Sequence, residues 1–168
     1  MCLDYVLLDI EASSFSDNAY PVEIAWGNEE GIESYLLDPS SVESWQDWSQ
    51  RSEAVHGISQ IMLASDGHNP REIYRKLDDI FSTKTVYSDE PEFDLHWLSA
   101  FERIFGCHTK TWKIHDIRQI LYTKLESGNN RSISAEEVLQ KARSEATKRH
   151  RAHDDVEILL KAVQIARG

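Results

Sequence analysis

The sequence predicts an α/β fold with a mixed central sheet. Three candidate strands come first, short strands then alternate with helices, and helices close the chain, which is the order typical of the α/β class. Apolar residues make up 40% of the 168 residues and are spread along the chain, with no repeat, linker or low-complexity stretch. We therefore expect one domain, residues 1–168, with a substantial buried core.

The first three predicted strands form an antiparallel meander. Residues 3–10 are a mostly apolar run that ends in an acid, a pattern typical of a strand buried on both faces. Residues 20–27 and 32–38 are two further strands, with Gly31 in the turn between them. In the segment 40–68 the spacing of Trp45 and Trp48 favours a short helix, and residues 55–59 are predicted to form a loop.

Helix signals become sharper after residue 68. Asn69 and Pro70 are a suitable N-cap and first residue for a helix whose apolar face carries Ile73 and Leu77. Ser134 and Glu137 form a capping-box pattern before another helix. The remaining predicted elements are strands at 85–88 and 111–115, helices at 92–104 and 116–124, and a final helix bearing Val156, Leu159, Leu160, Val163 and Ile165.

The net charge of −11 is unevenly distributed. Residues 1–100 hold 5 Lys/Arg against 20 Asp/Glu, whereas residues 101–168 hold 13 against 9. The later basic residues include Arg131, Lys141, Arg143, Lys148, Arg149 and Arg151. Because phosphate binding usually requires a basic surface, we expect weak affinity for long duplexes, while a short contact with one strand end is feasible.

Several cellular settings are disfavoured. Cys2 and Cys107 lack CxxC spacing, which favours reduced thiols over a disulfide or a zinc site. No apolar run reaches the length of about eighteen residues that spans a membrane, and the acidic N-terminus lacks the basic region of a signal peptide. We expect a cytoplasmic protein with no membrane partner.

Four acids and one histidine are the candidate chemical groups. Asp9 and Glu11 are two apart on a predicted strand, so both side chains point to the same face. Asp94 begins a middle helix, and His150 and Asp155 flank the start of the last one. Each has an ordinary alternative when taken alone: solvated acids for Asp9 and Glu11, a helix-dipole role for Asp94, and a structural role for the histidine.

The ordered combination resembles the histidine-bearing branch of the DEDD superfamily of 3′–5′ exonucleases, which includes ribonuclease T, oligoribonuclease and the proofreading subunit of bacterial DNA polymerase III. Residues 9–11 (Asp-Ile-Glu) resemble the first motif, Phe93-Asp94 the second, and His150-Arg151-Ala152-x-x-Asp155 the third. Residues 55–59 (Val-His-Gly-Ile-Ser) resemble a loop that many members carry. The resemblance spans roughly residues 5–165, and the second motif departs from the family because Asp89-Glu90-Pro91-Glu92 replaces its usual asparagine-containing lead-in.

The resemblance implies a ribonuclease H-like three-layer α/β/α fold and a two-metal site. Asp9, Glu11, Asp94 and Asp155 would hold two Mg²⁺ or Mn²⁺ ions, which prefer oxygen ligands. His150 would be the general base, since the unperturbed histidine pKa of about 6.5 suits that role. The expected substrate is a single-stranded 3′ end of DNA or RNA, and the expected product is a nucleoside 5′-monophosphate.

Substrate-binding residues are expected near the first motif. The small residues Ala12, Ser13 and Ser14 would let the backbone approach the terminal nucleotide. The aromatic rings of Phe15, His56 and Phe93 are candidates for stacking on bases, although core packing is the more common role for such side chains.

Other functions stay open at this stage. The acidic surface is compatible with a hydrolase of short oligonucleotides or nucleotide-like diesters, and a non-catalytic nucleic-acid-binding module on the same fold is a further alternative. A homodimer is possible: Trp45, Trp48 and Trp112 could serve its interface, but core packing explains them equally well.

Overall fold

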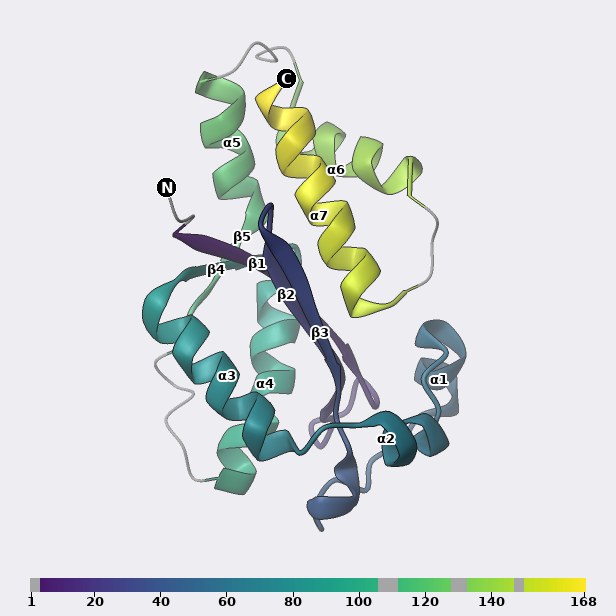
Figure 1. Cartoon of the computed structure of the whole chain (residues 1–168). Coiled ribbons are helices and arrows are strands. Elements are labelled where there is room, and N and C mark those ends of the chain that lie inside the picture. Colours follow the sequence, from purple (N-terminus) through teal and green to yellow (C-terminus); the bar gives the residue numbers. More distant parts are fainter. Residues whose placement is uncertain (1–3, 106–111, 128–132, 147–149) are drawn as a thin grey trace.

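The computed structural model describes residues 4–105, 112–127, 133–146 and 150–168 (Figure 1). Its strands are β1 (Tyr5–Ala12), β2 (Pro21–Asn28), β3 (Gly31–Leu36), β4 (Thr85–Ser88) and β5 (Ile114–Asp116). Its helices are α1 (Gln50–His56), α2 (Gln60–Asp66), α3 (Pro70–Thr83), α4 (Pro91–Phe105), α5 (Ile117–Ser127), α6 (Ala135–Ser144) and α7 (Ala152–Arg167), with a 3₁₀ turn η1 at Pro39–Ser41. Cys2 and Cys107 lie outside the described residues.

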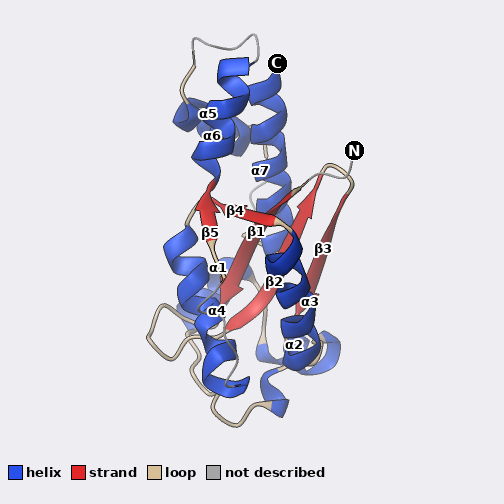
Figure 2. Cartoon of the chain, turned by 90° about the vertical axis from the view of Figure 1, so that its left-hand side faces the viewer, coloured by secondary structure: helices blue, strands red, loops and turns tan. Residues whose placement is uncertain are grey.

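The strands form one mixed sheet in the order β3-β2-β1-β4-β5. Strand β1 is antiparallel to β2, and β2 to β3, whereas β1–β4 and β4–β5 are parallel pairs. Figure 2 shows this sheet with helices on both sides of it. The predicted α/β class and mixed sheet are therefore confirmed.

Two separate apolar cores lie on the two faces of the sheet. Alternate residues of β1, namely Val6, Leu8 and Ile10, pack with α3 and α4. Tyr5 and Leu7 point the other way and pack with α5, α6 and α7, which group together in green to yellow in Figure 1. This two-sided burial explains why β1 reads as a nearly continuous apolar run.

The predicted helix starts after residue 68 are confirmed. Asn69 accepts a hydrogen bond from the Arg71 backbone N–H at 2.9 Å ahead of Pro70. Ser134 and Glu137 form the reciprocal bonds of a capping box at the start of α6. The last predicted strand is shorter at its beginning, since β5 starts at Ile114, and Thr111 lies outside the described residues.

Two predictions between residues 40 and 68 are wrong. Trp45 and Trp48 precede α1, which begins at Gln50 after the N-cap Ser49; the Trp45 ring is buried in the core and stacks on Tyr20. The predicted loop 55–59 is also too long, because its first two residues complete α1. Gly57 caps that helix, and its φ of 69° is a left-handed conformation that glycine adopts without strain.

Candidate functional site

The carboxylates of Asp9 and Glu11 lie on the α7 side of β1. They follow Tyr5 and Leu7 in the alternation of the strand and so belong to the same face. A carboxylate oxygen of each residue and one of Asp155 all lie within 4.8 Å of one another. Glu11 lies inside β1 rather than beyond its end, since the strand continues to Ala12.

The N-terminus of α7 brings Asp155 and His150 to the cavity that Asp9 and Glu11 line. Asp155 is in the first turn of the helix. His150 precedes the helix, is exposed, and has a backbone φ of 41°, which is uncommon for a residue other than glycine. Backbone strain of this kind is frequent at functional sites.

Helix α4 contributes Asp94, which is only 3% exposed. A cavity of about 500 Å³, which we call the carboxylate cleft, is lined by all five predicted groups: Asp9, Glu11, Asp94, His150 and Asp155. The structure thus brings together residues that are up to 146 positions apart in the chain.

The clustered carboxylates raise one another's pKa. Burial raises the pKa of Asp9 well above its usual value, and the charges of Asp94, Asp155 and Glu11 add to the effect. Burial and the charge of Asp155 raise the pKa of Glu11 to about 8. The pKa of Asp155 is raised to about 6, again by burial first, and burial also raises that of Asp94. Such a set of oxygen donors favours a divalent cation, which would offset the repulsion.

Glu23 of β2 organises the loop between His150 and α7, and the sequence reasoning missed it. It lies opposite Glu11 in the β1–β2 register and is 2% exposed. Its carboxylate accepts hydrogen bonds from Arg151 Nε at 2.8 Å, Arg151 Nη2 at 2.9 Å and the Ala152 backbone N–H at 3.0 Å. Glu23 therefore caps α7 in place of its N-cap residue, which makes no side-chain cap bond.

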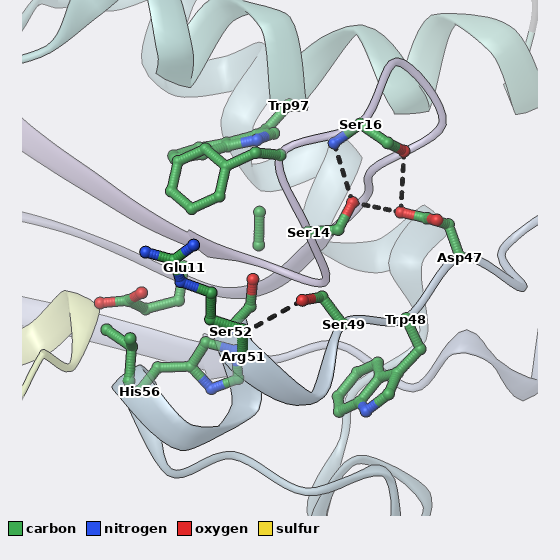
Figure 3. A pocket seen from close by; sticks show the side chains of 13 residues that line it. Glu11, Ser14, Ser16, Asp47, Trp48, Ser49, Arg51, Ser52, His56 and Trp97 are labelled. Carbon is green, nitrogen blue, oxygen red and sulfur yellow. Dashed lines mark hydrogen bonds between the residues drawn. The ribbon is translucent and has the colours of Figure 1, made fainter.

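A second cavity of about 540 Å³ adjoins the first and shares Glu11, Phe15 and Trp97 with it. Figure 3 shows this pocket, with Trp97 above, His56 below and Arg51 reaching between them. The pocket is within the size range of small-molecule sites.

Phe15 and Trp97 line both cavities, and Phe93 lines the first one beside them. Phe15 is 75% exposed and Phe93 is 49% exposed, so core packing, the more common role for such side chains, does not apply to them. Their ring centroids are 6.1 Å apart, and Trp97 contacts both at 5.9 and 5.8 Å. Trp97 was missed in the sequence, although its spacing of four from Phe93 places both rings on one side of α4.

His56, the third predicted stacking residue, is buried. Its Nδ1 accepts a hydrogen bond from the Ile58 backbone N–H at 3.0 Å, and its ring contacts Trp48 edge-on. Burial lowers the pKa of His56, which favours the neutral ring. His56 thus lines the second cavity as a fixed part of its wall.

The predicted small-residue segment, which begins with the last residue of β1, is also buried. Ala12 and Ser14 line the second cavity, whereas Ser13 does not; the Ser13 hydroxyl accepts a hydrogen bond from the Tyr20 backbone N–H at 3.1 Å. Ser14 donates to Asp47, which also accepts from Ser16 at 3.0 Å (Figure 3). These bonds fix the backbone that approaches the pocket.

Of the basic residues in the last third of the chain, some form ion pairs and others lie outside the described residues. Arg131, Lys148 and Arg149 lie outside the described residues. Arg151 forms an ion pair with Glu23, and Arg143 pairs with Asp89 at 2.6 Å.

Of the candidate dimer residues, Trp45 and Trp112 are buried in the core and Trp48 donates to Glu53 at 2.8 Å. In the described part of the chain, none of the helices has the length and apolar character needed to cross a membrane.

Comparison with known proteins gives one family match and several similar folds. The family model described as "Exonuclease" (RNase_T) matches residues 6–163. No curated protein matches the chain significantly.

Solved structures of nucleases have the same fold. Exonuclease I of E. coli, in a zinc-bound complex with single-stranded DNA, is 14% identical with a TM-score of 0.66; the match covers 97% of this chain and 39% of that one. Cell-death related nuclease 4 (CRN-4) is 11% identical with a TM-score of 0.69, over 97% and 63% of the two chains. A 3′-exonuclease that recognises the histone mRNA stem-loop is 14% identical with a TM-score of 0.69, over 99% and 64%. This chain therefore spans less than two thirds of their lengths, and the likeness confirms the predicted ribonuclease H-like fold.

Proposed function

The chain belongs to the exonuclease family defined by the RNase_T model, and from this premise we propose that it is a metal-dependent 3′–5′ exonuclease acting on single-stranded ends. The substrate would be DNA or RNA, and the product a nucleoside 5′-monophosphate. One observation carries this proposal: Asp9, Glu11, Asp94, His150 and Asp155, from three separate elements and one loop, line a single cleft.

The residues of the cleft fit a divalent metal site. Oxygens of Asp9, Glu11 and Asp155 are close enough to share an ion, and burial, together with the charges of neighbouring carboxylates, raises the pKa of each of these carboxyls. Together with Asp94, these three carboxylates would hold two Mg²⁺ or Mn²⁺ ions, because a ligand set made only of carboxylates suits hard cations. When bound, such ions lower the pKa of a water molecule and neutralise charge on a phosphodiester.

His150 is the proposed general base. Its side chain reaches the cleft from the loop before α7, and an imidazole nitrogen would take the proton from the attacking water and pass it to solvent. The exposed position of His150 favours that exchange. Glu23, through Arg151 and Ala152, holds the backbone next to this residue.

The second cavity is the proposed site of the terminal nucleoside. Phe15 and Trp97 border both cavities, so a strand that spans the two cavities would contact these rings. Aromatic faces bind unpaired bases with little sequence preference. A duplex end would have to separate before its last base reached this pocket, which favours a single-stranded 3′ end.

A labelled-strand assay tests the proposal. Single-stranded DNA, single-stranded RNA and a dinucleotide, each labelled at the 5′ end, are incubated with Mg²⁺ or Mn²⁺, and we expect a ladder that shortens from the 3′ end. EDTA should stop it. The dinucleotide tests the alternative of a hydrolase specific for very short substrates. If none of the three substrates is shortened with either metal, the chain is not an exonuclease.

A pair of variants on α7 tests the assignment of the site. Asp155→Asn should abolish metal-dependent cleavage, whereas Glu157→Gln removes an exposed carboxylate two residues away that does not line the cleft and should leave cleavage within about twofold of wild type. Full activity of Asp155→Asn would refute the proposed ligand set without refuting the activity itself.

A further inference from the structure

The carboxylate cleft contains one guanidinium group among its described lining residues, and it belongs to Arg143. Six carboxylates line the same cavity: Asp9, Glu11, Asp89, Glu90, Asp94 and Asp155. A phosphodiester is itself an anion, so a cationic donor in such a cleft is well suited to bind it. The guanidinium lies close enough to Asp155 for its charge to lower the pKa of that carboxyl.

Two neighbouring arginines are not available for this task. Arg151 gives two nitrogens to Glu23. Arg118 contacts Asp116 at 3.1 Å, Glu136 at 3.2 Å and the backbone carbonyl of Asp89 at 3.3 Å. Both side chains are therefore fully engaged in holding the fold together.

Arg143 is held much more loosely. Its Nη2 donates to Asp89 Oδ2 at 2.6 Å, and its other N–H groups have no partner within the residues that the structure describes. The side chain is 39% exposed and that of Asp89 is 20% exposed. An arginine carries five N–H donors, so this single contact leaves most of them without a partner among the described residues.

On the basis of the proposed exonuclease function, we propose that Arg143 binds a phosphate of the substrate strand and that Asp89 is the competing partner which holds the guanidinium in the free protein. The geometry of a carboxylate and that of a phosphate are alike for a guanidinium, since both accept two parallel N–H bonds. Arg143 then exchanges Asp89 for the phosphate, or shares its donors between them, when a strand enters.

The backbone around Asp89 is suited to such an exchange. Arg118 fixes the carbonyl of Asp89 in the loop between β4 and α4, so the backbone of this loop stays in place when Arg143 leaves the Asp89 carboxylate. The other explanation is a purely structural ion pair that ties α6 to this loop. The two explanations predict opposite effects of removing the Asp89 charge on strand binding.

Binding measurements distinguish them. The probe is a fluorescein-labelled single strand of ten thymidines, and its dissociation constant is measured by anisotropy with Ca²⁺ in place of Mg²⁺, so that the carboxylates keep a hard cation while cleavage is suppressed. Arg143→Ala should raise the dissociation constant about tenfold, and Arg143→Lys should restore part of the loss. Lys141→Ala is the matched control, because it removes one charge from the same helix at an exposed residue that does not line the cleft. Asp89→Asn should lower the dissociation constant about threefold, and the Asp89→Asn, Arg143→Ala double variant should bind like Arg143→Ala alone.

A change in the substrate tests the contact directly. Replacing one phosphate near the 3′ end by an uncharged methylphosphonate should abolish the effect of Arg143→Ala when the replaced linkage is the one contacted. Thermal melting of each variant monitors folding. The inference is overturned if Arg143→Ala weakens binding no more than Lys141→Ala, or if Asp89→Asn leaves binding unchanged or weaker. Cleavage by the wild-type chain in Mg²⁺ would then still support the proposed exonuclease, whereas a chain that neither binds nor cleaves the strand contradicts both.

Discussion

Substitution of Glu23 by glutamine tests how the fold holds the loop that carries His150 in place before α7. The carboxylate of Glu23 accepts four hydrogen bonds, three from Arg151 and the Ala152 backbone and one from the Ser34 hydroxyl at 3.0 Å. Glutamine keeps the volume of the side chain but removes its charge, and its amide N–H₂ meets the guanidinium donors of Arg151. The variant therefore breaks a buried ion pair while leaving the cavity filled.

The size of the effect follows from the burial of the two partners. Breaking a fully buried pair costs about 3–5 kcal/mol. The Arg151 side chain is 32% exposed and can recover part of its hydration, so we expect a loss of roughly 2–3 kcal/mol in the free energy of unfolding. For a chain of this size that loss corresponds to a fall in Tm of about 5–10 °C.

Activity should fall as well, at a temperature where the variant is fully folded. His150 immediately precedes Arg151, and a shift of about 1 Å in a reacting group can cost about a hundredfold in rate. We expect Glu23→Gln to lower kcat by roughly ten- to a hundredfold with little change in KM. The control is Glu33→Gln, which breaks an exposed pair with Lys76 and should change Tm by about 1–2 °C at most. A Glu23→Gln variant with wild-type Tm and wild-type kcat would refute the proposed positioning role.

Three further outcomes are expected. In the metal-free protein the free energy of unfolding should fall as pH rises from about 4.5 to 8. The reason is that the pKa of Glu11 rises from 4.5 to about 8 on folding, so Glu11 stays protonated in the folded state over a range where the unfolded chain has lost this proton. The change, on the order of 3 kcal/mol, is measured by urea titration and should shrink when Mg²⁺ is added. His150→Ala should lower turnover roughly 10²–10⁴-fold and leave Mn²⁺ binding measured by calorimetry largely intact, so a lost binding isotherm would contradict its role as base. Phe93→Ala should weaken binding of a single strand by about 1–3 kcal/mol, whereas Tyr122→Ala, which removes an exposed ring far from the cleft on α5, should not.

The elements that could be predicted from the sequence are those specified by local signals. The two-residue spacing of Asp9 and Glu11 fixes their common face whatever the rest of the fold does. The caps at Asn69 and Ser134 are contacts over two or three residues and were found for that reason. Even the placement of Asp94 was correct, since acids prefer the first turn of a helix.

The features that were missed depend on distant parts of the chain. Glu23 forms its bonds with residues 128 and 129 positions away, and its signal in the sequence was an unpaired acid within a strand of otherwise apolar or small residues. The spacing of Trp45 from Trp48 suggests a helix, whereas stacking on Tyr20 and contact with Phe101 decide the position of Trp45. The arrangement of Arg143 and Asp89 likewise requires α6 and the β4–α4 loop to meet in three dimensions.

The pairing of Glu11 with Glu23 across β1 and β2 sets a limit on which insertions the chain can accept. A slip of one residue between these strands would turn Asp9 and Glu11 toward the core that packs on α3 and α4. Asp17 and Asn18 lie in an exposed turn outside the paired register and line neither cavity, so the turn can gain or lose residues at these positions while the strands stay aligned. A single residue inserted between Leu7 and Glu11 would instead turn every β1 side chain on one side of the insertion to the opposite face of the sheet. Length variation among homologous chains should therefore gather in that turn and be absent from the eight residues of β1.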